Sequence, residues 1–264
     1  MSLLVEIACV SCCGKVRKTN EDNLLFQGRI LENTGGDLWP PQGCSLTLKE
    51  TPELIAVFDG MGGEANGEEA SFTAAKKLRE IWQNKPLNAQ MMFPVARKMN
   101  EAVFRRGQEL MTERMGTTMA VMTIGKTETV VSNLGDSPIF VMRNGKLHKV
   151  SKDHTDAEEM KRRGITNRKP YLTQYLGIDP EELTIEPYVA RIQTTSGDRY
   201  LLCSDGLTDM VEEPEIVRIL GGAASASDAV EALTIAALEN GGRDNVTIIA
   251  AFVRQRKENE ECSL

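Results

Sequence analysis

Between residues 116 and 150, short apolar runs follow one another with only turn residues between them, and this succession most restricts the possible folds. The Asn144-Gly145 turn is the clearest of these signals, because this dipeptide accepts the positive φ angles of the tightest hairpins. Strands joined by such short turns run antiparallel. The order of elements is therefore not that of a doubly wound parallel sheet.

The rest of the chain adds more strands and two pairs of helices. Apolar residues recur at three- and four-residue steps in the expected helices, which is the pattern of one buried helix face. Residues 31–52 are rich in Gly and Pro and are expected to form a long surface connection. Helices are expected at 67–84, 90–111, 155–163, 213–220 and 226–239, and strands at 4–13, 23–29, 54–58, 116–124, 127–134, 138–142, 146–150, 184–193, 198–204 and 245–253.

Strand meanders separated by helix pairs predict an α+β fold in four layers, an α/β/β/α sandwich. Two stacked, mainly antiparallel sheets would be covered on their outer faces by the helix pairs, so that strands are buried on both sides. We expect one domain over residues 1–254 and a charged, flexible tail over 255–264.

Composition restricts the partners of the chain. There are 31 basic and 38 acidic residues, a net charge of −7, which disfavours binding to nucleic acid or to anionic lipid. No apolar run has membrane-spanning length, and no basic and apolar leader opens the chain, so we expect a cytoplasmic protein with no membrane contact. The Cys9-x-x-Cys12 spacing has no second pair, so reduced thiols packed in strands are favoured over a zinc or redox site.

Four aspartates stand next to apolar strands. Asp59 and Asp205 each end such a run and precede a glycine, Asp136 follows VVSNLG, and Asp244 lies just before VTIIAAFV. Asp-Gly is also ordinary turn chemistry, and for any single position that simpler interpretation suffices. Four carboxylates converging at strand ends would need a compensating charge, however. Oxygen ligands without His or Cys favour Mg²⁺ or Mn²⁺ over zinc.

A charged segment near the N-terminus contributes further candidates. Arg17 offers a planar guanidinium suited to two phosphate oxygens, and Glu21 and Asp22 add two carboxylates. Taken alone, this segment is a solvated run of charges. It gains meaning only from the aspartates that accompany it.

Seven short motifs occur in a fixed order along the chain. Each is weak alone, but the set in this order and spacing is specific. Over residues 4–253 the chain resembles the metal-dependent type 2C protein phosphatases, and in particular their compact bacterial members. The motifs are VRKTNED (16–22), VFDGMGG (57–63), GTT (116–118), NLGDSP (133–138), KDHT (152–155), CSDGL (203–207) and GGRDNVT (241–247).

The resemblance implies a β-sandwich flanked by helix pairs and a site for two core Mn²⁺ or Mg²⁺ ions. By this resemblance Asp59 bridges the two ions and the Gly60 carbonyl binds one of them. Asp205 and Asp244 complete the other, and Asp136 helps to hold a third, weaker ion.

The same resemblance assigns catalytic roles. Glu21 and Asp22 match residues that reach the metals largely through water, and Arg17 matches the phosphate-binding arginine. Two ions about 3.5–4 Å apart would share a water, lower its pKa and direct it at phosphorus, with Arg17 and Asp59 as the catalytic residues. No covalent phosphoenzyme is required, so the cysteines are not expected to act as nucleophiles.

The chain departs from the family pattern at three places. Met61 stands where eukaryotic relatives have a histidine that is a candidate proton donor, Cys12 replaces an aspartate of many bacterial members, and Pro138 replaces an arginine. Residues 155–182 match the family's flap beside the active site and carry several basic residues. A basic lid that guides acidic phosphopeptides and a merely solvated loop are both open for this segment.

We therefore expect a metal-dependent phosphoserine/phosphothreonine protein phosphatase, acting on phosphorylated proteins that include a cognate Ser/Thr kinase. Two alternatives are a catalytically silent relative that binds phosphoproteins and a hydrolase of small phosphoesters. The presence of Asp59, Asp205 and Asp244 argues against the silent relative. No G-x-x-x-x-G-K-[ST] loop supports binding of a nucleoside triphosphate.

Overall fold

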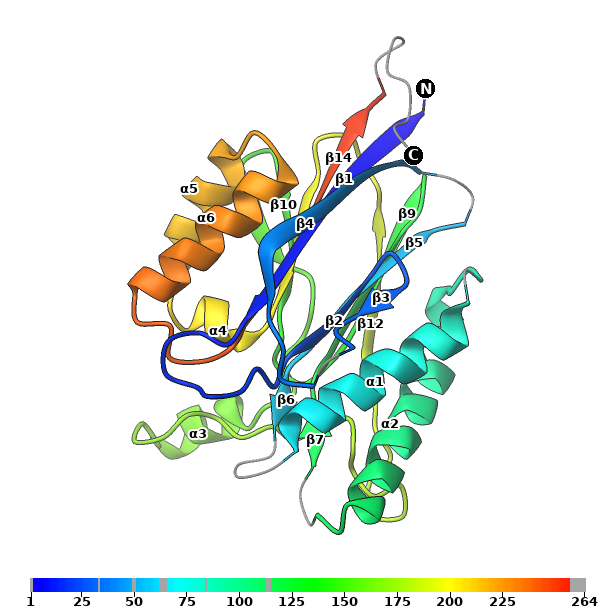
Figure 1. Cartoon of the computed structure of the whole chain (residues 1–264), viewed down its shortest axis with the longest axis vertical. Coiled ribbons are helices and arrows are strands. Elements are labelled where there is room, and N and C mark those ends of the chain that lie inside the picture. The colour runs from blue at the N-terminus through cyan, green and yellow to red at the C-terminus, as the bar shows by residue number, and fades with distance from the viewer. Residues whose placement is uncertain are drawn as a thin grey trace.

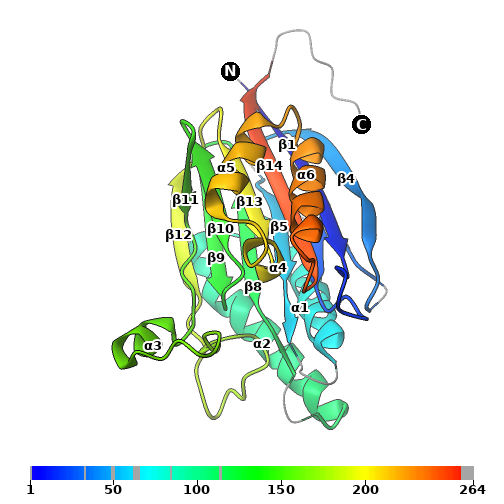
Figure 2. The ribbon, with the colours of Figure 1, turned by 90° about the vertical axis from the view of Figure 1, so that its left-hand side faces the viewer.

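The computed structural model describes residues 2–32, 34–48, 51–61, 66–83, 85–112 and 115–256. These residues form two stacked sheets with helices on both outer faces (Figures 1 and 2). The α+β, four-layer architecture expected from the order of elements is confirmed. Among the described helices, none combines the length and the apolar character needed to cross a bilayer.

Each sheet has six strands, and all of the pairings within the two sheets are antiparallel. A short pair, β6 (Gly60–Met61) and β7 (Gly116–Thr117), forms a separate ribbon. The first sheet has the order β11 (Lys146–Lys149), β10 (Ile139–Arg143), β13 (Arg199–Cys203), β14 (Val246–Gln255), β1 (Leu3–Cys12) and β4 (Leu38–Thr47). The second has the order β12 (Tyr188–Gln193), β9 (Glu128–Leu134), β8 (Met119–Ile124), β5 (Glu53–Phe58), β2 (Asn23–Phe26) and β3 (Arg29–Ile30).

Helices cover the outer face of each sheet. Against the second sheet lie α1 (Gly67–Trp82) and α2 (Met92–Glu109), the latter preceded by a 3₁₀ turn at Ala89–Met91. Against the first sheet lie α4 (Asp205–Thr208), α5 (Glu213–Gly222) and α6 (Ala226–Glu239). The short α3 (Ala157–Arg163) projects from the sandwich within the flap segment (Figure 2).

Central strands such as β5 and β14 have long apolar runs because both of their faces are buried. In β5, Leu54, Ala56 and Phe58 face α1 and α2, whereas Ile55 and Val57 pack between the two sheets. The same alternation runs along the central strands of the first sheet. A strand held on both sides is a rigid support for the residue that follows it.

Three local predictions are wrong. The strand expected at 116–124 is divided, because β7 pairs with β6 in the separate ribbon whereas β8 lies in the second sheet. Residues 31–52 are not simply a connection, because β4 within them pairs with β1 at the edge of the first sheet. An edge strand tolerates Pro40 and Pro41. Five of the ten β4 residues are exposed and five are partly buried, so neither an apolar run nor a strict alternation marked this strand. Residues 23–29 form the hairpin β2–β3 rather than a single strand.

Other boundaries agree with expectation to within a few residues. The helix at 226–239 has the predicted bounds, and the hairpin closed by Asn144 and Gly145, both with positive φ, joins β10 to β11. The last strand, β14, continues to Gln255. The rest of the predicted tail, residues 257–264, lies outside the described residues.

The core between the sheets predicts where truncation destabilises the protein most. Ile55 is fully buried there, so Ile55→Ala should lower the free energy of unfolding by about 2–5 kcal/mol. Ile235 on α6 is 42% exposed, and Ile235→Ala should change it by less than about 0.5 kcal/mol. Urea titrations of both variants measure these differences. Equal effects would contradict the assignment of the inter-sheet core.

Candidate metal and phosphate site

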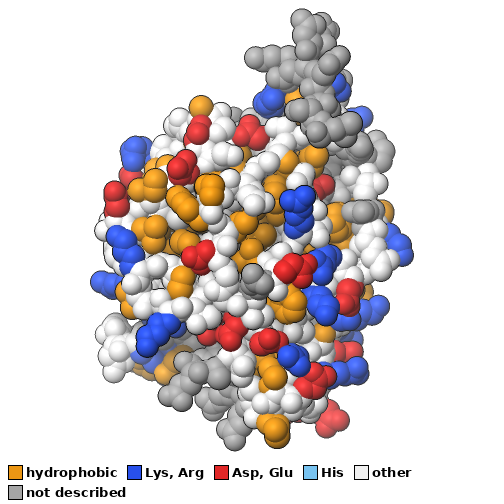
Figure 3. Space-filling view, viewed as in Figure 1, with side chains coloured by type: hydrophobic (Ala, Val, Ile, Leu, Met, Phe, Trp, Pro, Cys, Tyr) orange, Lys and Arg blue, Asp and Glu red, His pale blue; other side chains and the backbone are white. Residues whose placement is uncertain are grey.

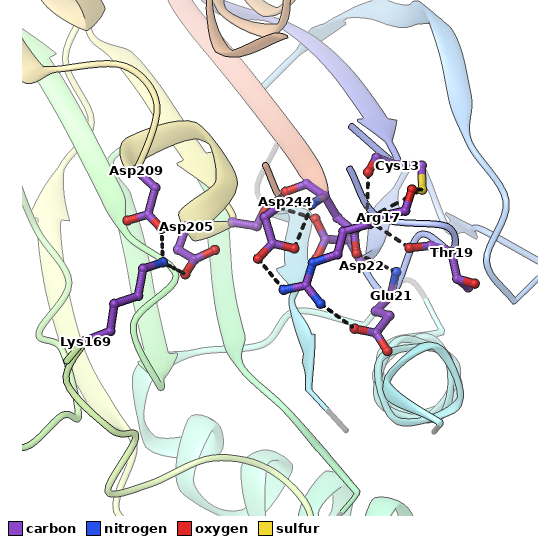
Figure 4. Close-up of polar contacts among 11 residues, drawn as sticks. Cys13, Arg17, Thr19, Glu21, Asp22, Lys169, Asp205, Asp209 and Asp244 are labelled. Carbon is purple, nitrogen blue, oxygen red and sulfur yellow. Dashed lines mark hydrogen bonds and ion pairs between the residues drawn. The ribbon is translucent and has the colours of Figure 1, made fainter. Parts of the chain in front are cut away.

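The candidate residues gather at one end of the sandwich. β5 and β13 end there, β14 begins there, and the segment between β1 and β2 crosses the same end. Acidic side chains reach the surface between α4 and the start of α1 (Figure 3). The close-up shows Asp22, Asp205 and Asp244 turned toward a common region, with Arg17 and Glu21 on one side and Lys169 on the other (Figure 4).

The backbone of Asp59 is fixed by two threonines. Its N–H donates to Thr118 Oγ1 at 3.0 Å, and its carbonyl accepts from the Thr118 N–H and the Thr117 hydroxyl, both at 2.9 Å. Burial and the charges of Asp22 and Asp205 raise the pKa of the Asp59 carboxyl well above its usual range. The group is therefore held in a place where its negative charge needs a cation.

Gly60 joins this strand end to the N-terminal segment. Its N–H donates to the carbonyl of Glu21 at 3.1 Å. A Cβ at this position would lie 2.2 Å from the carbonyl oxygens of both Glu21 and Gly67. The close approach of three backbone segments therefore requires glycine.

Asp22 is the most deeply buried of these carboxylates, with 3% of its surface exposed. Oδ2 accepts a hydrogen bond of 2.8 Å from the Ser204 hydroxyl, whereas Oδ1 is buried without a protein partner. Burial is the main cause that raises its pKa to about 7, and the charges of Asp205 and Asp244 add to it. An unsatisfied buried carboxylate oxygen is the kind of atom that a cation or its water satisfies.

Asp205 is the first residue of α4, directly after β13. Burial raises its pKa to about 6, and the nearby charges of Asp209 and Asp136 act in the same direction. Asp136, after β9, also has a raised pKa because of burial and the charge of Asp153. Asp136, Asp205 and Asp209 line one surface cavity of about 460 Å³ beside the flap.

Arg17 bridges two carboxylates of the site. Its Nη2 lies 2.7 Å from Asp244 Oδ2, and its Nη1 lies 3.9 Å from Glu21 Oε2. The arginine side chain is 47% exposed, so its guanidinium borders solvent. Burial raises the pKa of Glu21, and Arg17 opposes that rise.

Asn245 fastens the N-terminal segment to the start of β14. Its Oδ1 accepts from the Glu21 N–H at 2.8 Å, and its Nδ2 donates to the carbonyls of Cys13 and Thr19, each at 3.0 Å. Asn245 is 4% exposed. Both ends of the segment that carries Arg17 are thus tied to one amide.

The residues present fit hard divalent cations. The donors are carboxylate and carbonyl oxygens, one of them buried and unsatisfied, and Gly60 leaves no room for a side chain. Within the described residues, no three His, Cys, Asp or Glu side chains are grouped closely enough to hold an ion by themselves. Arg17 and Lys169 instead pair with Asp244 and Asp205. Water would have to complete the ligand set.

The structure places all eight predicted site residues at this end of the sandwich, but it leaves their roles untested. Sequence reasoning missed Ser204, Asn245 and Asp209, and it counted Lys169 among the basic residues of the flap without assigning it a partner in the site. Asn245 and Ser204 lie next to predicted aspartates, and that adjacency was the only available signal. The partners of Lys169 depend on the path of the flap, for which the sequence offers no pattern.

Carboxylates gather at the strand ends of a helix-flanked double sheet, and an arginine lies beside them. This combination is typical of metal-dependent phosphohydrolases. The profile described as Protein phosphatase 2C matches residues 44–239, and the chain belongs to this family. The resemblance drawn from the seven motifs is thereby confirmed.

Relatives span most of the chain. The serine/threonine phosphatase Stp of Listeria welshimeri is 31% identical over 251 residues, covering 89% of this chain and 91% of its own. The phosphatase PstP of Mycobacterium tuberculosis is 30% identical over 261 residues, which are 96% of this chain and 46% of PstP.

Solved structures of such proteins share the fold. A crystal structure of Mycobacterium tuberculosis PstP superposes with a TM-score of 0.77 at 27% identity, covering 96% of this chain and 100% of that one. A PstP catalytic domain in complex with two manganese ions gives 0.76 at 28% identity, with the same coverage.

The pKa of Asp22 predicts how metal-free stability depends on pH. This carboxyl has a pKa of about 7 when folded against an ordinary value of 3.8, so between these values only the folded state keeps the proton. The contribution of Asp22 to the free energy of unfolding should therefore fall as pH rises from about 4 to 7. Asp22→Asn, which does not ionise, should gain stability relative to wild type over this interval.

Thermal unfolding in EDTA between pH 4.5 and 7.5 measures the difference between the two proteins. Mn²⁺ should raise the wild-type midpoint at pH 7.5 more than at pH 5, because ionised carboxylates bind cations. Parallel curves for wild type and Asp22→Asn would contradict the raised pKa.

Proposed function

We propose that this protein is a metal-dependent phosphoserine/phosphothreonine protein phosphatase. The observation that supports this most is the convergence of Asp59, Asp205 and Asp244 at one sandwich end, with Arg17 at the solvent border. Water attacks the phosphorus of the phosphate monoester, the P–O bond to the Ser or Thr oxygen breaks, and that oxygen takes a proton. Inorganic phosphate and the free hydroxyl side chain are the products.

Two core Mn²⁺ or Mg²⁺ ions would be held by Asp59, the Gly60 carbonyl, Asp205 and Asp244, with Glu21 and Asp22 reaching them through water. Asp136 would help to hold a third. When bound, such ions lower the pKa of water and neutralise phosphoryl charge. A PstP catalytic domain holds two manganese ions, which supports two core sites here.

Arg17 is suited to receive the phosphate. Its guanidinium is at the solvent border of the site and forms ion pairs with Asp244 and Glu21. Metal ions bound in the site would take over these two carboxylates. On substrate binding, the planar fork can exchange these carboxylates for two phosphoryl oxygens. Asn245 keeps the backbone on both sides of Arg17 in place during that exchange.

The leaving-group proton has no histidine donor at position 61, where this chain has Met61. His154 does not fill that role. The backbone N–H of His154 donates to the Gly135 carbonyl at 3.0 Å, and the ring Nδ1 lies 3.4 Å from the same oxygen. Burial lowers the pKa of the imidazole. His154 therefore anchors the start of the flap. We propose that water supplies the proton.

Phosphorylated proteins, including a cognate Ser/Thr kinase, are the proposed substrates, and bacterial cytoplasmic signalling is the proposed setting. The names of the relatives from Listeria and Mycobacterium support this substrate class. The proposed domain spans residues 1–254. Nothing in the site favours the silent relative or the small-phosphoester hydrolase over this function.

The decisive test is phosphate release from a phosphothreonine peptide with Mn²⁺. Wild type should be active and EDTA should abolish the activity, because the carboxylates alone cannot activate water. Asp59→Asn and Asp205→Asn should each lower kcat by more than about a hundredfold. Activity that survives these changes would overturn the two-metal mechanism, and a preference for nucleotides in a parallel panel would support the small-phosphoester alternative.

Asn245 provides a second prediction. Asn245→Ala should lower kcat/KM about 10- to 100-fold and weaken inhibition by inorganic phosphate, because Arg17 loses its fixed backbone. Asn240→Ala is the matched control, since Asn240 is the C-cap of α6 and its side-chain amide donates to the Met210 carbonyl rather than to the segment that carries Arg17. Equal phosphate inhibition in both variants would show that Asn245 does not position Arg17.

A further inference from the structure

The flap carries one basic side chain into the acidic site. Lys169 Nζ lies 3.7 Å from Asp205 Oδ2 and forms a closer ion pair with Asp209 (Figure 4). Asp136 lines the same cavity as these three residues. The ammonium therefore borders the same cavity as Asp205 and Asp136, in which a cation held by these two carboxylates would bind.

Three of the other four basic residues of the flap pair with carboxylates outside the site. Arg162 and Arg163 pair with Glu159 on α3, and Arg168 pairs with Asp156. The fourth, Lys161, is exposed on α3. Among the described flap residues, Lys169 is the one whose ion pairs reach the site. The flap thus presents a single tethered charge to the site rather than a broad basic surface.

Contacts of Arg168 hold the backbone at Lys169 in place. The Arg168 guanidinium stacks on the Tyr171 ring at 3.9 Å, pairs with Asp156, and donates to the Lys169 carbonyl at 2.9 Å. Asp156 also accepts from the Tyr171 N–H at 2.7 Å. The backbone at Lys169 is therefore fixed on both sides, although the lysine side chain itself is 70% exposed.

We propose that Lys169 is a tethered cation that occupies Asp205 within the cavity shared with Asp136, and that a metal ion held by these two carboxylates binds there only by displacing it. The inference rests on the proposed function, since it concerns the outermost ion of that site. Lys169 would then lower the affinity of this ion by its ion pair with Asp205, which is also a proposed ligand of a core ion. It also links flap position to metal occupancy, because the displaced lysine no longer holds the flap against α4.

The size of the effect follows from competition. An ion pair between exposed side chains is weak, so a divalent ion can displace it. The ion can bind only while Lys169 is away from the Asp205 carboxylate. Its apparent affinity is therefore reduced in proportion to the fraction of time that the lysine is bound there. Removing the ammonium while keeping the length of the side chain should therefore tighten the weakest Mn²⁺ site about two- to sixfold.

Titration of the full-length protein with Mn²⁺, followed by the electron paramagnetic resonance signal of free Mn²⁺, counts the ions and measures each affinity. Lys169→Met should tighten the weakest site, and Lys161→Met, at an exposed lysine of the same flap, should not. Tyr171→Ala removes the ring under Arg168 and should tighten this site by a smaller factor. Circular dichroism confirms that each variant is folded.

The outcomes separate the two proposals. If wild type binds no Mn²⁺, the proposed function itself fails. If wild type binds its ions but Lys169→Met leaves the weakest affinity unchanged or lowers it, the proposed function stands and the tethered-cation inference is overturned. A gain in Lys161→Met equal to that in Lys169→Met would also overturn it, because the effect would then reflect flap charge in general.

Discussion

Repulsion among carboxylates at one end of the sandwich is the constraint on which the site depends. Asp22, Asp59 and Asp205 each have a raised pKa because they are desolvated and surrounded by like charges. Such an arrangement is unfavourable for folding unless cations offset it. Among the described residues, Arg17 and Lys169 form ion pairs at the edges of this group. The centre is left for ions from solution.

The fold makes this arrangement possible by holding strand ends rigidly. β5, β13 and β14 are packed on both faces, so the residues at their ends cannot move apart to relieve repulsion. Hydrogen bonds that cross between elements add to this restraint. Thr118 fixes Asp59, Ser204 fixes Asp22, and Asn245 fixes the segment of Arg17. The rigid sheets therefore hold the charged side chains in place before an ion or a substrate binds.

The layers and the carboxylates were predictable from sequence because they follow from local patterns. An apolar run that ends in Asp-Gly fixes both a buried strand and the position of its carboxylate, as at Asp59 and Asp205. The edge strand β4 was missed because it has Pro40 and Pro41 and side chains that are exposed or only partly buried. Asn245 was missed because its partners are backbone groups more than 200 positions away, which no local pattern encodes.

Arg17 and Lys169 stand on opposite sides of the acidic group, and their chemistry suits different exchanges. The Arg17 guanidinium is a planar fork that can transfer its hydrogen bonds from carboxylates to a phosphate, so it suits the side where substrate enters. The Lys169 ammonium is a compact point charge without a preferred plane, which resembles a metal ion more than it resembles an arginine. In the roles that we propose, each side chain competes for its carboxylate with a different kind of incoming group. Arg17 and Lys169 neutralise part of the negative charge at the edges of the site. Because both ion pairs are partly exposed and therefore weak, an incoming phosphate or metal ion can displace them.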